Sequence, residues 1–337
     1  MEETPPVGDE ARTTGESPTT GESPLFSLVA GEGDGFLLGQ AAGDAAGGAW
    51  ELGYSAVTEQ ATVIAYQLIE NRRLDPQRTL RDVRELDGLE GDEPVYRAES
   101  VHFRVWLDRA AAGAPVPEEE PSLDGAPRAT PVGVAFRRDA ERVVVESVAL
   151  NRHFHSETSS LAAGAIVAAA VAASCYGQAG VDLVAGVSEA VLPRRDTIAA
   201  GSGGVERLQR LEDDFARARR LVGLSEGEKV LASFGGNASD PIQMAMTGLV
   251  LAAAVSTRPH VPLEEAARVG GSVLGAAVGA IVGARVGIRP WPWVFANDTW
   301  FAEIGRRLVR GPDEVRDLPI PYAVEFHITS GERPGFY

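Results

Sequence analysis

The sequence is poor in cysteine and in positive charge. The 337-residue chain contains one cysteine, Cys175, and one lysine, Lys229. A single cysteine cannot form a disulfide within the chain, so the disulfide framework of a small secreted protein is excluded. The 31 Lys and Arg residues face 48 Asp and Glu residues, which gives a net charge of −17. This balance disfavours binding to nucleic acid or to an anionic membrane surface, because both attract basic proteins.

A secretion signal is also missing from the start of the sequence. No basic segment followed by an apolar run opens the chain, so we expect no signal peptide and a cytoplasmic location. Apolar residues, in contrast, are plentiful. They make up 44% of the chain, and glycine occurs 38 times. This content is enough for one large core, and the abundance of small residues indicates closely packed helices.

The first 34 residues differ in composition from the rest. They contain TTGESP at residues 13–18 and again at residues 19–24, and they are rich in Pro, Gly, Ser, Thr and Glu. Such a composition buries too little apolar surface to offset the entropy lost on ordering. We therefore expect residues 1–34 to form a disordered acidic tail, which is either simply solvated or docks onto a protein partner.

The remaining sequence has a helical pattern from residue 35 to about residue 310. The expected helices cover residues 36–50, 57–71, 97–112, 158–176, 205–222, 241–256 and 264–287. A loop rich in Pro and Glu is expected at residues 113–131, and the aromatic residues at 291–309 are expected to cap the bundle. Residues 311–337 form a C-terminal extension with a short extended pattern. The pattern predicts an all-α fold.

Glycines recur every fourth residue in the last of these predicted helices. They are Gly271, Gly275, Gly279, Gly283 and Gly287. This spacing places them along one helix face, and each costs about 1 kcal/mol relative to alanine, so we expect close packing against another backbone. Only 16 residues separate Arg268 from Arg285, fewer than the ~20 that span a bilayer. A buried helix of a soluble bundle is therefore expected, with no membrane.

Six segments in order carry a resemblance to a known family. They are GFLLGQAAGDAAGGAWE (35–51), GYSAVTEQATVIAYQLIE (53–70), APRATPVGVAF (126–136), LNRHFHSETSSLAAGAIVAAAVA (150–172), ASDPIQMAMTGLVLAAA (238–254) and EEAARVGGSVLGAAVGAIVGARVG (264–287). Together they resemble motifs of the ADP-ribosylglycohydrolase family. The resemblance covers about residues 35–310 and implies one domain, an all-α orthogonal helical bundle of the ADP-ribosylglycohydrolase type.

The resemblance also implies a metal site that this sequence lacks. In the family, a T-D-D motif and a D-x-D-T motif hold two divalent ions, usually Mg²⁺, in a cleft that binds ADP-ribose. Such hard cations prefer carboxylate oxygens. Here Ala56, Val57 and Thr58 stand at T-D-D, while Ser272 and Val273 replace the second aspartate and the threonine of the other motif. We therefore predict that the divalent Mg²⁺ site is lost and that no metal cofactor is bound.

Two carboxylates remain as candidate catalytic residues. Glu51 stays at a family position near the substrate, and Glu59 lies within one turn of the lost aspartates. A pair of carboxylates is the usual equipment of metal-free glycoside hydrolysis. Each residue also has a structural reading, since Glu51 could cap a helix and Glu59 could be a surface or ion-paired side chain. Asp44 matches a family position that is more structural than catalytic.

Further residues are candidates for ligand binding. Thr58 and Ser272 offer neutral oxygens at the former metal positions, and Arg128 is either structural or faces phosphates. The sequence HFHSE supplies His153 and His155, which could contact a nucleotide, pack at a helix start or, with Glu157, chelate a transition metal.

The turn FGGNASD (234–240) precedes a helix, whose N-terminus could bind a phosphate with the help of Asn237 and Ser239. Turns of this kind also serve simply as linkers.

Three functions follow from this pattern. The favoured one is a catalytically degenerate relative that binds an ADP-ribose-like ligand or a protein partner, the latter through the N-terminal tail. The alternative is a metal-independent glycohydrolase or lyase that acts on an N-glycosidic or sugar-nucleotide substrate through Glu51 and Glu59. The third is an assembly protein whose cleft is filled by Val57, Val273 and Leu274. The sequence predicts no oligomeric state.

Overall fold

The structure is a computed structural model that describes residues 33–49, 54–87, 96, 100–112, 120–199, 205–256, 258–288, 291 and 297–311. Within these ranges the chain forms helices and no β-strand, which confirms the predicted all-α class. Most of the expected acidic tail lies outside the described residues, as do the C-terminal extension beyond Gly311 and the candidate catalytic residue Glu51.

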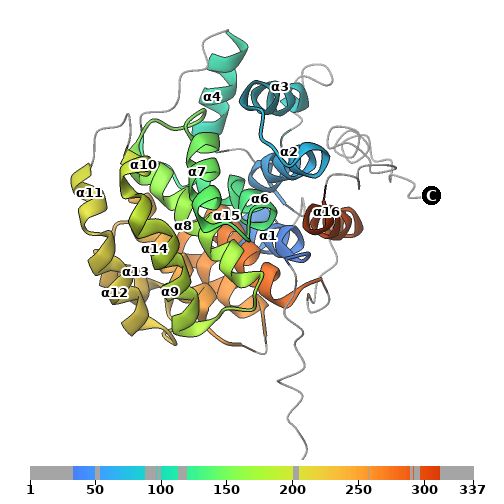
Figure 1. Cartoon of the computed structure of the whole chain (residues 1–337). Helices are drawn as coiled ribbons and strands as arrows, with labels where there is room; N and C mark the ends of the chain where they lie inside the picture. Colours follow the sequence, from blue (N-terminus) through green and yellow to red (C-terminus); the bar gives the residue numbers. More distant parts are fainter. Residues whose placement is uncertain are drawn as a thin grey trace, which may run out of the picture.

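The structure consists of helices of very different lengths (Figure 1). In order they are α1 (Phe36–Asp44), the π-helical turn η2 (Ala45–Ala49), α2 (Ala56–Asn71), α3 (Pro76–Asp87), α4 (Val101–Ala111), α5 (Gly125–Arg128), α6 (Thr130–Ala135), α7 (Ala140–Asn151), α8 (Thr158–Ser174), α9 (Gly180–Val191), the 3-10 turn η3 (Leu192–Arg194), α10 (Arg195–Ala199), α11 (Val205–Gln209), α12 (Leu211–Leu221), α13 (Gly227–Phe234), α14 (Pro241–Ala253), α15 (His260–Val286) and α16 (Asp298–Arg310).

Two glycine-rich helices, α1 and α15, form the centre of the bundle (Figure 1). A Cβ atom added at Gly43 would lie under 3.0 Å from the carbonyl oxygen of Gly275, and one added at Gly39 would overlap the carbonyl oxygen of Gly279 in the same way. The predicted backbone-to-backbone packing of the glycine face is therefore confirmed. It fixes α1 and α15 in antiparallel contact, since only glycine leaves room for such an approach.

Helix α15 is kinked near its middle. Gly270 has φ −130° and Gly271 has φ 63° with ψ −161°, neither of which is helical. By length and composition alone α15 could cross a membrane, but 61% of its apolar window is buried inside the protein. Its packing against α1, α8 and α14 accounts for its apolar composition. The kink divides it into two helical halves, and the second half begins beside η2.

Several sequence expectations needed correction. The predicted loop at 113–131 contains α5 and the start of α6, where Pro131 occupies the first turn that tolerates proline. The helix expected over 36–50 changes to a π-helical turn, in which Gly48 has φ 125°. Helices α7 and α9 were not predicted, although Asp139 accepts a hydrogen bond from the backbone N–H of Arg142 and so marks the start of α7.

Candidate functional site

A buried cluster of oxygens joins α1 to the start of α2. The Asp44 carboxylate, which is fully buried, accepts hydrogen bonds from the Ser55 N–H (2.9 Å), the Ser55 hydroxyl (2.7 Å) and the Thr58 hydroxyl (2.7 Å). The Ser55 hydroxyl in turn accepts from the Val57 N–H and caps α2. Burial raises the pKa of Asp44 above its ordinary value, and the hydrogen bonds oppose that shift. Asp44 therefore holds the N-terminus of α2 in place.

The residues at the former T-D-D positions are packed inside the protein. Ala56, Val57 and Thr58 are 1%, 7% and 0% exposed, respectively. Glu59 follows in the first turn of α2 and is only 1% exposed, so it is not the surface side chain that one interpretation expected. A carboxylate in the first turn complements the positive end of the helix dipole. Its predicted partner, Glu51, lies outside the described residues.

The second half of α15 begins beside η2. A Cβ atom added at Gly47 would overlap the backbone of Ser272, so the two segments touch. Ser272 and Val273 are half-buried. Cβ atoms added at Gly48 and Gly271 would meet no described atom within 4 Å. Open space therefore borders both the kink of α15 and the end of η2.

Arg128 lies in a buried polar network that connects α2, α5 and the segment before α8. Its guanidinium donates to Gln60 Oε1 (2.7 Å) and to His155 Nε2 (3.2 Å), and it lies 3.9 Å from the centre of the Phe154 ring. Burial lowers the pKa of Arg128 to about 10, an effect opposed by the charge of Asp124. Arg128 therefore keeps its charge at neutral pH and binds groups of its own protein.

The two histidines of HFHSE have different surroundings. Burial lowers the pKa of His155 well below 6.5, as do the charges of Arg128 and His102, so its ring is neutral at pH 7. Since a guanidinium only donates, Nε2 accepts and Nδ1 carries the proton. His153 is half-buried, and burial lowers its pKa as well. The backbone carbonyl of His153 accepts a hydrogen bond from the Trp106 indole (3.0 Å).

The polar turn before α14 is exposed and largely satisfied by its own atoms. The Asn237 side chain accepts from the Ser239 N–H (3.0 Å), and the Asp240 carboxylate caps α14 by accepting from Ile242 and Gln243. A Cβ atom added at Gly270 would overlap the side chain of Met244, which places the first turns of α14 beside the α15 kink.

The predicted site residues thus fall into two groups. Thr58 and Glu59 lie at the start of α2, and Arg128 and His155 form the adjoining network through Gln60. Ser272 lies at the kink of α15, near α14 but on a separate element from Asn237 and Ser239. His153 instead contributes its backbone carbonyl to the contact with Trp106. Their roles in ligand binding stay predictions, and Gln60, which holds Arg128, was not predicted as a site residue because its partner lies 68 residues away in the sequence.

The hypothesis that His153, His155 and Glu157 chelate a metal ion has limited support in the structure. Among the described residues, no three or more His, Cys, Asp or Glu side chains are gathered where they could hold a metal ion. In the HFHSE segment, His155 contacts Arg128 and Glu157 caps α8 through the Ser159 and Ser160 N–H groups. Because Glu51 is not described, loss of the Mg²⁺ site stays a prediction.

Comparison with solved structures identifies the fold class. A structure titled "ADP-ribosylglycohydrolase-related protein complex" matches with a TM-score of 0.56 and 19% sequence identity, covering 84% of this chain and 98% of that chain. This level of identity establishes the all-α fold alone. No curated protein matches the sequence.

The family follows from the sequence itself. A profile of the ADP-ribosylglycohydrolase family matches residues 33–317. The chain therefore belongs to the ADP-ribosylglycohydrolase family, as its motifs suggested.

Proposed function

We propose that this family member has lost metal-assisted hydrolysis and binds a nucleotide-like ligand of the ADP-ribose class as a regulatory or assembly protein. The observation that carries the proposal is the 2.7 Å hydrogen bond from the Thr58 hydroxyl to Asp44. In the alignment that the resemblance implies, Thr58 occupies the position of a metal-binding aspartate of the T-D-D motif. A hydroxyl that donates to a buried acid offers a divalent cation no negative charge.

The neighbouring positions support the same conclusion. Val57 is 7% exposed and supplies only alkyl groups where the family motif has a carboxylate. Val273, at the start of the second half of α15, likewise supplies only alkyl groups. Loss at both positions, more than 200 residues apart in the sequence, affects both halves of the two-metal site.

The kink of α15 provides a metal-free way to bind an anion. The non-helical backbone at Gly271 starts a new helical segment inside α15. The first N–H groups of such a segment favour negative charge, as at any helix N-terminus. A Cβ atom added at Gly271 would meet no described atom within 4 Å, so the described residues leave space for a ligand beside this internal start. A phosphate of an ADP-ribose-like ligand would complement it.

One observation favours the alternative, a metal-independent glycohydrolase or lyase. Glu59 is a carboxylate, 1% exposed, in the first turn of α2. Buried carboxylates serve as acids or nucleophiles in glycoside hydrolysis. In this alternative Glu59 acts together with Glu51 on an N-glycosidic or sugar-nucleotide substrate.

Calorimetric titration of ADP-ribose, first in EDTA and then in excess Mg²⁺, tests the main proposal. We expect saturable binding that is the same in both buffers. The variant Ser272→Leu should weaken it at least tenfold by filling the space at the kink, whereas the matched change Ser225→Leu, at an exposed loop position, should leave it unchanged. Binding that requires Mg²⁺ would overturn the loss of the metal site, and no binding in either buffer would favour an assembly role.

The hydrolase alternative has its own test. Wild-type protein and Glu59→Gln are incubated in EDTA with an ADP-ribosylated peptide, and released ADP-ribose is measured. Turnover by the wild type that disappears in Glu59→Gln would favour the alternative over the main proposal. Absence of turnover in the wild type, with ADP-ribose binding retained, is the result that the main proposal predicts.

A further inference from the structure

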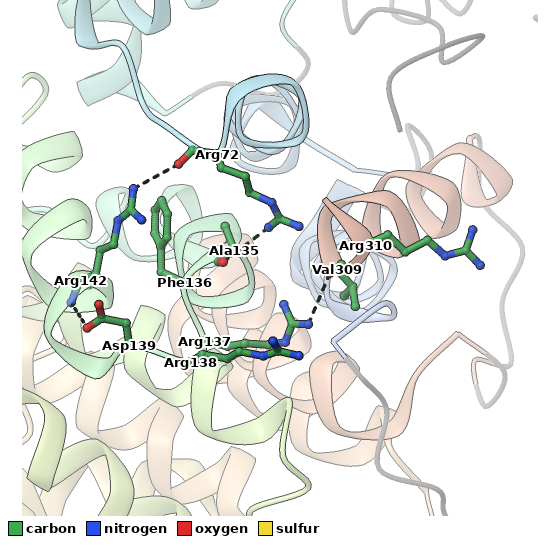
Figure 2. A pocket seen from close by; sticks show the side chains of 9 residues that line it. All are labelled: Arg72, Ala135, Phe136, Arg137, Arg138, Asp139, Arg142, Val309 and Arg310. Carbon is green, nitrogen blue, oxygen red and sulfur yellow. Dashed lines mark hydrogen bonds between the residues drawn. The ribbon is translucent and has the colours of Figure 1, made fainter. Parts of the chain in front are cut away.

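An arginine-rich pocket lies at the opposite end of α2 from the candidate site. It has a volume of about 320 Å³ and forms where α2, α6 and α16 end (Figure 2). Five of its nine lining residues are arginines, and one is an acid, Asp139. The arginines, which define the "arginine pocket", are Arg72, Arg137, Arg138, Arg142 and Arg310. Such a group stands out in a chain with a net charge of −17.

Two of these arginines are directed elsewhere. Arg142 pairs with Glu146 (3.3 Å), donates to the Arg72 carbonyl (3.2 Å) and lies 4.0 Å from the centre of the Phe136 ring. Arg310 points away from the other guanidinium groups in Figure 2. Arg72, Arg137 and Arg138 remain, and their side chains extend into the space between α6 and α16 (Figure 2).

These three arginines have no carboxylate partner among the described residues. Arg72 donates to the Ala135 carbonyl (3.5 Å), and Arg137 donates to the carbonyls of Val134 (3.0 Å) and Val309 (3.4 Å). Each guanidinium has five N–H groups, so most donors stay available. Burial lowers the pKa of Arg72, and so does the nearby charge of Arg137. The two cations are therefore close enough to repel each other.

A purely structural explanation is that these arginines cap the C-terminal ends of α2, α6 and α16. Three helices end here, and each C-terminus carries about half a negative charge. Together they offset roughly half of the charge of Arg72, Arg137 and Arg138. Capping therefore accounts for part of the charge and for a few of the donors. The remaining donors face solvent and are available to an anion that takes several hydrogen bonds at once.

We propose that the arginine pocket binds the phosphate or pyrophosphate group of a small ligand. Guanidinium forks match phosphate oxygens in geometry and charge, and the volume is at the lower end of the range for ligand pockets. The one aromatic lining residue, Phe136, is covered by Arg142. Recognition therefore stops at the phosphate and includes no base. This site is independent of the proposed function, because about 21 Å of helix separates Thr58 from Arg72.

A competing occupant exists within the chain itself. A Cβ atom added at Gly33 would lie 3.3 Å from Val134 and 3.6 Å from Val309, so the acidic residues 1–32 join the fold beside the pocket. Glu16 and Glu22, one in each TTGESP repeat, are then candidate competing anions from the chain itself. The two possibilities predict different affinities for pyrophosphate after these carboxylates are removed. If the tail occupies the pocket, pyrophosphate binds more tightly without them, and otherwise its affinity is unchanged.

The test is calorimetric titration of inorganic pyrophosphate into the full-length protein at low and at moderate NaCl. We expect one-to-one binding that weakens with salt, because exposed charges are screened. Arg138→Gln, which removes a side chain that makes no hydrogen bond to the described residues, and Arg72→Gln should each weaken binding at least tenfold. Arg219→Gln, an equal charge change at an exposed position of α12, should change it less than twofold.

Two further arms identify the occupant. ADP should bind no more than about tenfold more tightly than pyrophosphate, since the pocket offers no base contact. The double variant Glu16→Gln/Glu22→Gln should bind pyrophosphate as the wild type does. The proposal is overturned by absence of saturable binding, by equal weakening in Arg219→Gln, or by binding that tightens more than tenfold in the tail variant, which would make the tail the occupant.

Discussion

Helix α2 begins at a cluster of buried oxygens and ends at a cluster of half-exposed guanidinium groups. At its start, Asp44 accepts three hydrogen bonds from Ser55 and Thr58. At its end, the side chains of Arg72 and Arg137 donate to backbone carbonyls and to no carboxylate of the described residues. At the first end, the Asp44 carboxylate is paired with donors of the protein itself. At the second end, most guanidinium N–H groups have no acceptor among the described residues. We infer that the first end determines stability and that the second is free to determine binding.

The largest expected effect on stability is at Asp44. Asp44→Ala removes three hydrogen bonds and leaves buried donors of Ser55 and Thr58 without an acceptor. The free energy of unfolding should fall by about 3–5 kcal/mol, measured by urea denaturation. The control is Asp139→Ala at the exposed start of α7, where loss of the cap costs about 1 kcal/mol. Equal losses in the two variants would contradict the structural role of Asp44.

The pH dependence of the same site gives a second measure. Burial raises the pKa of Asp44 above 3.8. An acid with a higher pKa in the folded state stabilises the fold below its unfolded pKa, and this contribution is lost as pH rises through the folded pKa. The wild type should therefore lose stability relative to Asp44→Asn between acidic and neutral pH. If the wild type instead gained stability relative to Asp44→Asn as the pH rises, the hydrogen bonds would outweigh burial in setting the pKa of Asp44.

A smaller loss is expected when a carboxylate is restored at a former metal position. Thr58→Asp places a second acid against Asp44 at a fully buried site. We expect the free energy of unfolding to fall by about 2–3 kcal/mol. Thr58→Asn is the control, because it makes a similar change in shape without adding a charge. Thermal unfolding with and without Mg²⁺ is the measurement. Recovery of stability in Mg²⁺ would show that the other half of a metal site persists, against the proposed loss.

Arg72 should contribute less to stability than either residue at the start of the helix. Arg72→Gln removes one long hydrogen bond to Ala135 and leaves a long unbranched side chain at the left-handed backbone of φ 50°. The expected loss is about 0.5–1 kcal/mol, again from urea denaturation. A loss as large as that of Asp44→Ala would make the arginine a structural residue and break the contrast between the two ends.

The smallest effect is expected at Arg138. This exposed side chain makes no hydrogen bond within the described part of the chain, so Arg138→Gln should change stability by less than about 0.5 kcal/mol. Pyrophosphate should raise the melting temperature of the wild type by binding the folded state, and the increase should be smaller in Arg138→Gln. An unchanged increase would separate the arginine pocket from anion binding.

The sequence predicted local features of the fold better than their combinations. The helix at residues 56–71 and the glycine face of α15 were visible because both depend on nearby residues. The kink was not, since Gly271 resembles the other glycines of the repeat and differs only in its backbone angles. The arginine pocket was missed because Arg72 and Arg137 meet only when α2 packs against α6.

The candidate site was predictable to a similar degree. The resemblance located the start of α2 and the middle of α15 as its two sides. The burial of Glu59 could not be read from its position in the first turn, because helix periodicity does not say which faces are covered by distant helices. The role of Arg128 also depended on Gln60 and His155, which lie 68 and 27 residues away.

The glycine contact between α1 and α15 has a consequence for synthesis of the protein. Gly39 and Gly279 are 240 residues apart in the sequence, and at about 5–20 residues per second a ribosome needs roughly 12–48 s to make the second after the first. Throughout that interval the central face of α1 has no partner. The emerging chain therefore exposes the apolar residues of α1 until translation reaches α15, an interval in which aggregation competes with folding.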